Sequence, residues 1–349
     1  MRRQVDPMTR KAKRKITIRD VADLVDVHHS TVSRALSPTK RDQISPEVVK
    51  RVEKAAKKLG YYPNILASSL KQNRSFAIGV LIPDLMNPVF PPIIRGIQDT
   101  AEAVGYTVIT ANTDDEEAKE RDALRMMQGR SIEGVIIATA RRNDPVVKEC
   151  IDNDIPFVLV NRTVDRDGVN AVVIDEDFGI RSVLDHLMSL KHTHIAHIAG
   201  PQHTSTGYHR ARVVSDHLRN HNLRTDLVEI TEKFTIAEGR RAFRKLLARD
   251  NSFTAVVAGN DLLALGCMDA MKEIGLLVPE NISVSGYDDI QFLERMNPAL
   301  TTVLVPKYEM GSQATKTLLD MISGESSGSG VLKMQPRLVI RNSTAVAYR

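Results

Sequence analysis

Short continuous runs of apolar residues alternate with longer stretches of helical periodicity from residue 76 onward in this 349-residue chain. Runs such as Val135-Ile136-Ile137 do not alternate with polar residues, which is typical of a parallel sheet covered on both faces. Because the alternation recurs on both sides of residue 165, it predicts two similar α/β lobes, each with a doubly wound parallel sheet.

The strands are expected at residues 76–82, 107–110, 134–138, 157–161, 171–174, 194–199, 228–230, 254–258 and 282–286. Helices are expected between them, the first two at 91–104 and 117–129. The late segments 302–305 and 337–341 are predicted to cross back between the lobes, and the Gly/Ser-rich stretch 324–330 to form a surface loop.

The first part of the chain has helical periodicity without strands, so it is predicted to be an all-α head. Two short helices are expected between Ile18 and Leu36, joined by a turn of about three residues. A third helix is expected to begin with Ser45 as its N-cap and Pro46 in its first turn, and to end at Gly60.

Charge is unevenly distributed along the chain. Residues 1–75 contain 18 Lys and Arg against 7 Asp and Glu, whereas the remainder is net acidic. A basic head on an acidic body indicates a polyanionic partner for the head. A solvated basic tail would account for residues 1–15, which we predict to be a disordered arm, but not for the helical pattern that follows.

Two helices joined by a short turn cross steeply, so the second is free to enter a DNA major groove. Arg34 can bind guanine bidentately, His29 and Ser30 lie at the start of the second helix, and Thr31 and Ser33 can bind phosphates. The alternative is a helical hairpin packed inside a larger protein. That alternative requires apolar residues on two faces of the second helix, but its outward face is polar.

Several motifs, in order along the chain, resemble the lac repressor (LacI/GalR) family of bacterial regulators. They are Ile18–Leu36, Gly60-Tyr61-Tyr62-Pro63-Asn64, Ile78-Gly79-Val80-Leu81-Ile82-Pro83-Asp84, Gly286-Tyr287-Asp288-Asp289 and Pro336-Arg337-Leu338-Val339-Ile340-Arg341. The resemblance implies a helix-turn-helix domain at 16–62, a hinge helix at 63–74, and a periplasmic-binding-protein-like body at 75–349. It divides the body into an N-lobe at about 75–172 and 304–333 and a C-lobe at about 173–303 and 334–349.

The same resemblance places His29, Ser30 and Arg34 at the main base-reading positions and Arg19 at another DNA contact. In the hinge, Leu70 corresponds to a leucine that wedges into the minor groove and kinks the duplex. A plain linker would be expected to show Gly, Pro or charge there instead. The predicted DNA-binding residues are Arg19, His28, His29, Ser30, Thr31, Ser33, Arg34, Ser45, Asn64, Leu70 and Lys71.

A cleft between two α/β lobes suits a small polar ligand, because strand ends and helix N-termini supply hydrogen-bonding groups there. Carried over by resemblance, the predicted ligand-binding residues are Asn87, Phe90, Asn161, Thr206, Arg210, Asn260, Asp261 and Asp288. An arginine, carboxylates and an aromatic ring are the chemistry that recognises a polyol.

Eight of the ten histidines lie between His186 and His221, which raises the question of a metal site. His192 and His194 are expected to alternate on one strand face, without a cysteine or paired carboxylate to complete a tetrahedral site. No nucleophile elbow, P-loop or dinucleotide-binding motif is found. We therefore expect no metal, no cofactor and no enzymatic activity.

Cys150 and Cys267 match no disulfide or metal spacing, no apolar run reaches the length of a membrane span, and no signal peptide is found. These absences predict a cytoplasmic protein. The resemblance implies a regulator that binds pseudo-palindromic double-stranded operator DNA as a homodimer or tetramer. Most members of the family are repressors, so a repressor is expected here. The expected effector is a sugar or a sugar-like molecule. The alternatives are a sugar-binding or sugar-modifying protein without DNA function and, less favoured, a DNA-binding enzyme.

Overall fold

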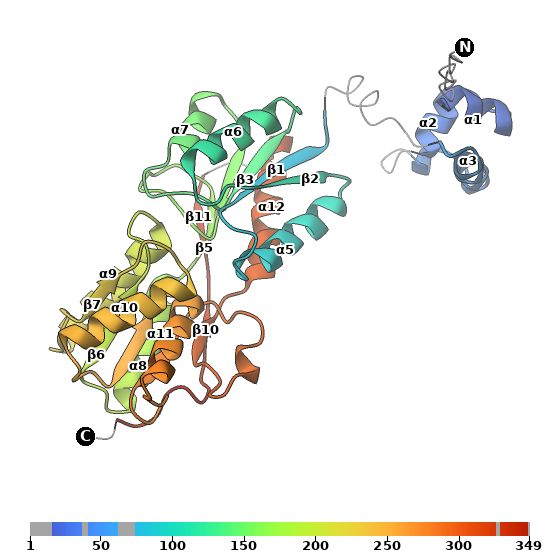
Figure 1. The fold of residues 1–349 in the computed structure, drawn as a ribbon. Coiled ribbons are helices and arrows are strands. Elements are labelled where there is room, and N and C mark those ends of the chain that lie inside the picture. Colours follow the sequence, from blue (N-terminus) through green and yellow to red (C-terminus); the bar gives the residue numbers. More distant parts are fainter. Residues whose placement is uncertain (1–15, 37–40, 62–73, 326–328, 348–349) are drawn as a thin grey trace, which may run out of the picture. The chain divides into compact units, whose positions relative to one another are not determined.

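The computed structural model describes residues 16–36, 41–61, 74–325 and 329–347. It divides into two compact units, Met1–Ser75 and Phe76–Arg349 (Figure 1). The predicted arm at 1–15 and most of the predicted hinge lie outside the described residues.

The first unit contains the three predicted helices, α1 (Ile18–Val25), α2 (His29–Ala35) and α3 (Pro46–Leu59), with a 3₁₀ turn η1 (Arg41–Gln43) before α3. Their apolar faces meet in one small core, formed by Val21, Ala22, Val32, Ala35, Val49, Val52, Ala55 and Ala56. This confirms that the head is all-α and that its helical periodicity predicts its core.

The ends of these helices follow local rules with one exception. Thr17 and Asp20 form a capping box at the start of α1, and Asp26 ends it in the left-handed region with φ 53°. Gly60 ends α3 with φ 66°. Ser45 occupies the predicted N-cap position of α3 and Pro46 the first turn, but the exposed Ser45 side chain makes no capping hydrogen bond. Because Pro46 has no N–H, the start of α3 has one donor fewer to satisfy.

The second unit holds two lobes, each built on a parallel sheet. The N-lobe sheet has the strand order β11-β5-β4-β3-β1-β2. Its strands are β1 (Ala77–Ile82), β2 (Thr107–Asn112), β3 (Gly134–Ile137), β4 (Phe157–Val160), β5 (Ala171–Ile174) and β11 (Val331–Met334). All its pairs are parallel, as predicted.

Helices cover both faces of the N-lobe sheet, which is why its central strands are apolar throughout. The helices are α5 (Phe90–Glu102), α6 (Glu117–Gln128), α7 (Pro145–Asp152) and α12 (Lys307–Ser323). Leu81 and Val135 face α6 and α7, whereas Val80 and Ile136 face α5 and α12.

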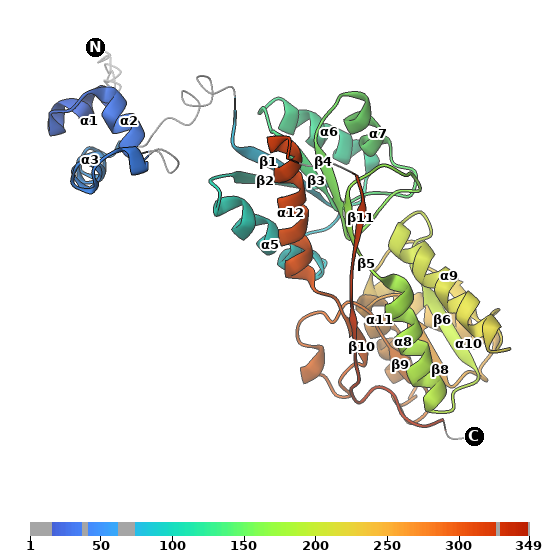
Figure 2. The same cartoon turned by 180° about the vertical axis from the view of Figure 1, so that it is seen from behind.

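The C-lobe repeats this arrangement with a four-stranded parallel sheet in the order β7-β6-β8-β9. The strands are β6 (Ile195–Ala199), β7 (Val228–Ile230), β8 (Ala255–Ala258) and β9 (Ser283–Ser285). The helices are α8 (Glu176–Ser189), α9 (Ser205–Asn220), α10 (Ile236–Arg249) and α11 (Asp261–Glu273), and a 3₁₀ turn η2 (Leu293–Arg295) follows β9. Helices α8 and α9 pair on one face and α10 and α11 on the other (Figure 2).

The late segments cross between the lobes, where β10 (Thr302–Leu304) and β12 (Arg337–Val339) pair antiparallel. Strand β11 was not expected; its sequence Val331-Leu332-Lys333-Met334 is short and interrupted by a lysine, and most of it is exposed at the edge of the sheet. The expected strand placement of His192 and His194 is wrong, because β6 begins only at Ile195. Among the described residues, no helix has the length and apolarity needed to cross a bilayer.

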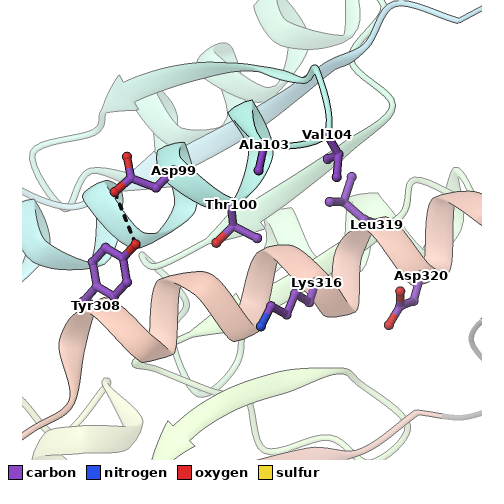
Figure 3. Close-up of a pocket in the computed structure, with 8 residues that line it drawn as sticks. All are labelled: Asp99, Thr100, Ala103, Val104, Tyr308, Lys316, Leu319 and Asp320. Atoms are coloured by element: carbon purple, nitrogen blue, oxygen red, sulfur yellow. Dashed lines mark hydrogen bonds between the residues drawn. The ribbon is translucent and has the colours of Figure 1, made fainter. Parts of the chain in front are cut away.

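Helices α5 and α12 pack unusually closely, and glycines make this approach possible. A Cβ atom on Gly96 would collide with the carbonyl of Tyr308, and one on Gly311 would collide with the carbonyl of Ile93. Figure 3 shows a pocket on this helix pair, where Tyr308 Oη donates to Asp99 Oδ2 at 3.2 Å.

We predict that Gly311→Ala lowers the free energy of unfolding by about 1–3 kcal/mol, because backbone atoms must move to admit the methyl group. Denaturant titration of the full chain measures the loss. Gly129→Ala is the matched control, since its Cβ would meet its nearest neighbour at an ordinary 3.5 Å. Equal stability of the two variants would contradict the close packing of α5 on α12.

Candidate DNA-binding surface and ligand cleft

Helix α2 buries Val32 and Ala35 and turns polar side chains outward. His28, His29, Ser33 and Arg34 are exposed, whereas Ser30 and Thr31 are half-buried. The exposed side chains lie on the surface that the sequence predicts to enter a major groove.

The start of α2 is held by His28 itself. Its Nδ1 accepts hydrogen bonds from the backbone N–H of Ser30, at 3.4 Å, and from the Ser30 hydroxyl, at 2.8 Å. A neutral ring that accepts at Nδ1 carries its proton on Nε2. The His29 ring lies beside it, with the ring centres 4.0 Å apart. His28 is therefore a helix cap as well as a candidate DNA contact.

Of the remaining predicted DNA contacts, the structure describes two. Arg19 in α1 and Ser45 before α3 are both exposed. Asn64, Leu70 and Lys71 lie outside the described residues, so their predicted role in the hinge stays a prediction.

In the second unit, ten residues from both lobes, most of them polar, line a cleft. The lining residues are Asn87, Val89, Phe90, Asn161 and Arg162 from the N-lobe, and Thr206, Arg210, Phe234, Asn260 and Asp288 from the C-lobe. All ten follow the carboxyl end of a parallel strand, either directly or in the loop or helix that comes next. This is the position at which open α/β sheets bind ligands.

Two of the lining residues have a positive backbone φ angle. Asn161, directly after β4, has φ 67°, and Asp288, after β9, has φ 108°. Residues other than glycine seldom adopt this region, and such conformations cluster at ligand sites. Asn260 caps α11, where its side chain accepts the N–H of Leu263 at 3.0 Å.

Arg210 makes the largest set of polar contacts described for the C-lobe side of the cleft. Its Nε and Nη2 donate to the two carboxylate oxygens of Glu176 at 2.7 and 3.0 Å, and its Nη1 donates to the carbonyl of Gly259 at 2.7 Å. Asp288 Oδ1 lies 3.5 Å from Nη2, and the guanidinium stacks 3.7 Å above the Tyr287 ring. Burial by itself would lower the pKa of Arg210, but the carboxylates of Glu176 and Asp288 outweigh it and raise this pKa.

Asp261 was predicted with the other ligand contacts, but the structure places it behind the cleft lining. It is fully buried and accepts hydrogen bonds from Thr302 Oγ1 at 2.5 Å and from the N–H of Ile290 at 2.9 Å. Burial and the nearby Asp288 carboxylate raise its pKa well above its usual range. Asp261 thus joins α11 to β10 and to the segment that carries Asp288.

Four residues of the site were missed by the sequence analysis. Val89 and Arg162 adjoin predicted residues, and Phe234 follows β7 as the other lining residues follow their strands, so the strand-end rule would have found them. Glu176 stands at the first position of α8, where an acidic residue is common in any helix. Its bond to Arg210 depends on tertiary packing and leaves no signal in the sequence.

Comparison with known proteins decides the family. Residues 17–64 match the model for bacterial regulatory proteins of the lacI family, and residues 184–344 match a periplasmic binding protein-like domain. The transcriptional repressor CytR of Escherichia coli is 33% identical over 94% of this chain and 96% of its own length. The chain belongs to the LacI family.

Two other regulators are also similar to this chain over most of its length. The ribose operon repressor of Halalkalibacterium halodurans is 32% identical over 94% of this chain and 97% of its own length. The lac repressor dimer bound to operator and the anti-inducer ONPF matches with a TM-score of 0.83 and 26% identity, over 95% of this chain and all of that one. Both the DNA-binding region and the body match LacI-family regulators. The alternative interpretation, a sugar-binding protein without DNA function, therefore has no support.

Several contacts join the two lobes of this LacI-family body beside the cleft. The backbone N–H of Arg142 donates to the carbonyl of His203 at 2.9 Å, and its guanidinium lies 3.5 Å from the centre of the Tyr208 ring. The N–H of Thr163 donates to Ser205 Oγ at 2.9 Å. The structure therefore holds the lobes in contact.

Arg162, which lines the cleft, belongs to a charged cluster of the N-lobe. Arg162 donates to Asp115 Oδ1 at 3.0 Å and to the carbonyl of Thr139 at 3.1 Å. Although burial opposes it, the nearby His203 and Arg162 hold the pKa of Asp115 well below its usual range. The Thr139 hydroxyl also donates to Glu120, and burial together with the Asp144 charge raises the pKa of Glu120 to about 7.

Two histidines of the group between His186 and His221 form hydrogen bonds inside the C-lobe. His192 bonds Thr254 Oγ1 and the carbonyl of Ala345, and His197 bonds the carbonyl of Val257. Among the residues that the structure describes, no three His, Cys, Asp or Glu side chains are grouped so that they could hold a metal ion.

We predict that Glu120→Gln removes a pH dependence from the stability of the body. The pKa of Glu120 is higher in the folded chain than in the unfolded one, so its protonation stabilises the fold at low pH. This contribution is lost as the pH rises through about 7. Relative to the wild type, Glu120→Gln should gain about 3 kcal/mol in free energy of unfolding between pH ~4.5 and pH ~8.

Denaturant titrations across this pH range measure the difference. Glu117→Gln, which removes an exposed carboxylate from the same helix, is the control for the loss of a charge. A constant difference between Glu120→Gln and the wild type would show that Glu120 titrates normally.

Proposed function

We propose that this LacI-family chain is a sequence-specific repressor whose affinity for operator DNA is controlled by a small polar ligand in the cleft. The observation that carries the proposal is the cleft lining, in which amides, a hydroxyl, a carboxylate and two phenylalanine rings converge from both lobes. Such groups hydrogen-bond hydroxyls and pack against the apolar face of a sugar ring. The effector is accordingly a sugar or a sugar-like molecule.

A ligand that binds both walls at once has a different affinity for each arrangement of the two lobes, so it shifts the population between them. The segments that cross between the lobes, which include β10 and β12, are where such a rearrangement is absorbed. We propose that the rearrangement alters how the heads of two protomers engage a pseudo-palindromic operator in the cytoplasm. The named relatives are regulators rather than enzymes, and the same is proposed for this chain.

The DNA-binding role is tested by selecting operators from random duplexes and measuring affinity against salt concentration. Binding to the selected site should weaken steeply with salt, because Lys and Arg side chains release counterions from DNA. A selected site without two-fold symmetry, or an affinity independent of salt, would contradict the proposal.

We predict that Arg34→Ala lowers affinity for the selected operator by about 1–3 kcal/mol and relaxes preference at one base position. The proposal rests on the exposure of Arg34 on α2 and on the ability of an arginine to bind guanine bidentately. Arg125→Ala, which removes an exposed arginine from α6 in the other unit, is the control for charge. If both variants lose the same affinity at every sequence, Arg34 acts through charge alone and reads no base.

A further inference from the structure

The charged groups of the cleft allow the ligand class to be narrowed, on the assumption that the proposed function is correct. An arginine in a ligand cleft would ordinarily favour an anionic ligand, because its N–H groups bind a carboxylate or phosphate in pairs. Arg210 offers two such pairs, Nε with Nη2 and Nη1 with Nη2. The question is which partners already bind them.

Groups of the protein bind both pairs. Glu176 accepts from Nε and Nη2 with its two oxygens, at 2.7 and 3.0 Å. The other edge of the guanidinium meets the carbonyl of Gly259, 2.7 Å from Nη1, and Asp288 Oδ1, 3.5 Å from Nη2. An anionic ligand would have to displace one of these partners and leave its charge or carbonyl buried without compensation.

The fold holds Glu176 firmly in this position. Glu176 is the first residue of α8, where the helix dipole favours a negative charge, and Asp175 caps that helix by accepting the N–H of Phe178 at 3.1 Å. Gly179, one turn on, lets α8 approach the Tyr287 ring, on which Arg210 also stacks; a Cβ on Gly179 would collide with Tyr287. The packing of α8 thus positions the Glu176 carboxylate against Arg210.

The other charged groups of the cleft also disfavour an anionic ligand. Arg162 also lines the cleft, and Asp115 neutralises it at 3.0 Å. Together, two arginines face the three carboxylates of Asp115, Glu176 and Asp288. The buried Lys307, whose ammonium group bonds the backbone of Asp288, balances the third carboxylate. An anion in the cleft would therefore meet no uncompensated positive charge, whereas ligand hydroxyls can donate to Asp288 and bond the amides of Asn87, Asn161 and Asn260.

We propose that Glu176 is a specificity-determining residue, which neutralises Arg210 so that the cleft selects an uncharged polyhydroxylated ligand over a sugar acid or sugar phosphate. Glu176 acts through Arg210 and is a positioning residue for the ligand site.

Matched pairs of probes test this: ribose with ribose 5-phosphate, glucose with glucuronate, and galactose with galacturonate. Binding to the full chain is measured by calorimetry and by the shift in unfolding temperature at constant ionic strength. In the wild type, no acid or phosphate should bind more tightly than its neutral counterpart. In Glu176→Gln, at least one anionic probe should bind about tenfold or more tightly than it does to the wild type.

Two control variants separate the effect from general charge and from misfolding. Glu176→Asp keeps the charge and should retain the neutral preference, and Glu117→Gln removes an exposed carboxylate elsewhere and should gain no anion binding. Tighter binding of an anionic probe to the wild type, or no gain of anion binding in Glu176→Gln, would overturn the proposal. Operator affinity measured on the same samples distinguishes the two failures, since an intact, salt-dependent affinity leaves the proposed function standing.

Discussion

A buried guanidinium organises the ligand-binding body. Arg210 is almost wholly removed from water, and an arginine in such a place destabilises the fold unless its charge and its N–H groups are satisfied. The partners come from the start of α8, the end of β8 and the end of β9, so the ion network fixes three separate segments of the C-lobe against one another. The shape and charge of the cleft wall follow from this requirement.

The same network continues into the junction between the lobes. Lys307, at the start of α12, donates to the backbone carbonyls of Asp288 and Asp289, and Arg341 pairs with Asp289 at 2.8 Å. The segment that contacts Arg210 is therefore bonded directly to the chain that crosses into the N-lobe. In the proposed function, a ligand that binds Asp288 would act directly on the segment that joins the two lobes.

Much of this could be predicted from the sequence, because the relevant signals are local. The periodicity of Val21, Ala22 and Val32 predicts the core of the head, and the resemblance to the LacI family predicts most of the residues that line the cleft. The exceptions depend on the tertiary structure. Strand β11 is an exposed sheet edge, and Glu176 resembles any acidic residue at a helix start. Asp261 follows a strand as its neighbours do, but its side chain turns into the core.

The central claim is that occupancy of the cleft and binding of operator DNA are coupled. The most direct measurement is the operator affinity of the full chain with and without a ligand shown to bind the cleft, together with the ligand affinity with and without operator. Linkage requires both affinities to change by the same factor, and the account predicts a factor different from one. A ligand that binds the cleft and leaves operator affinity unchanged would contradict it.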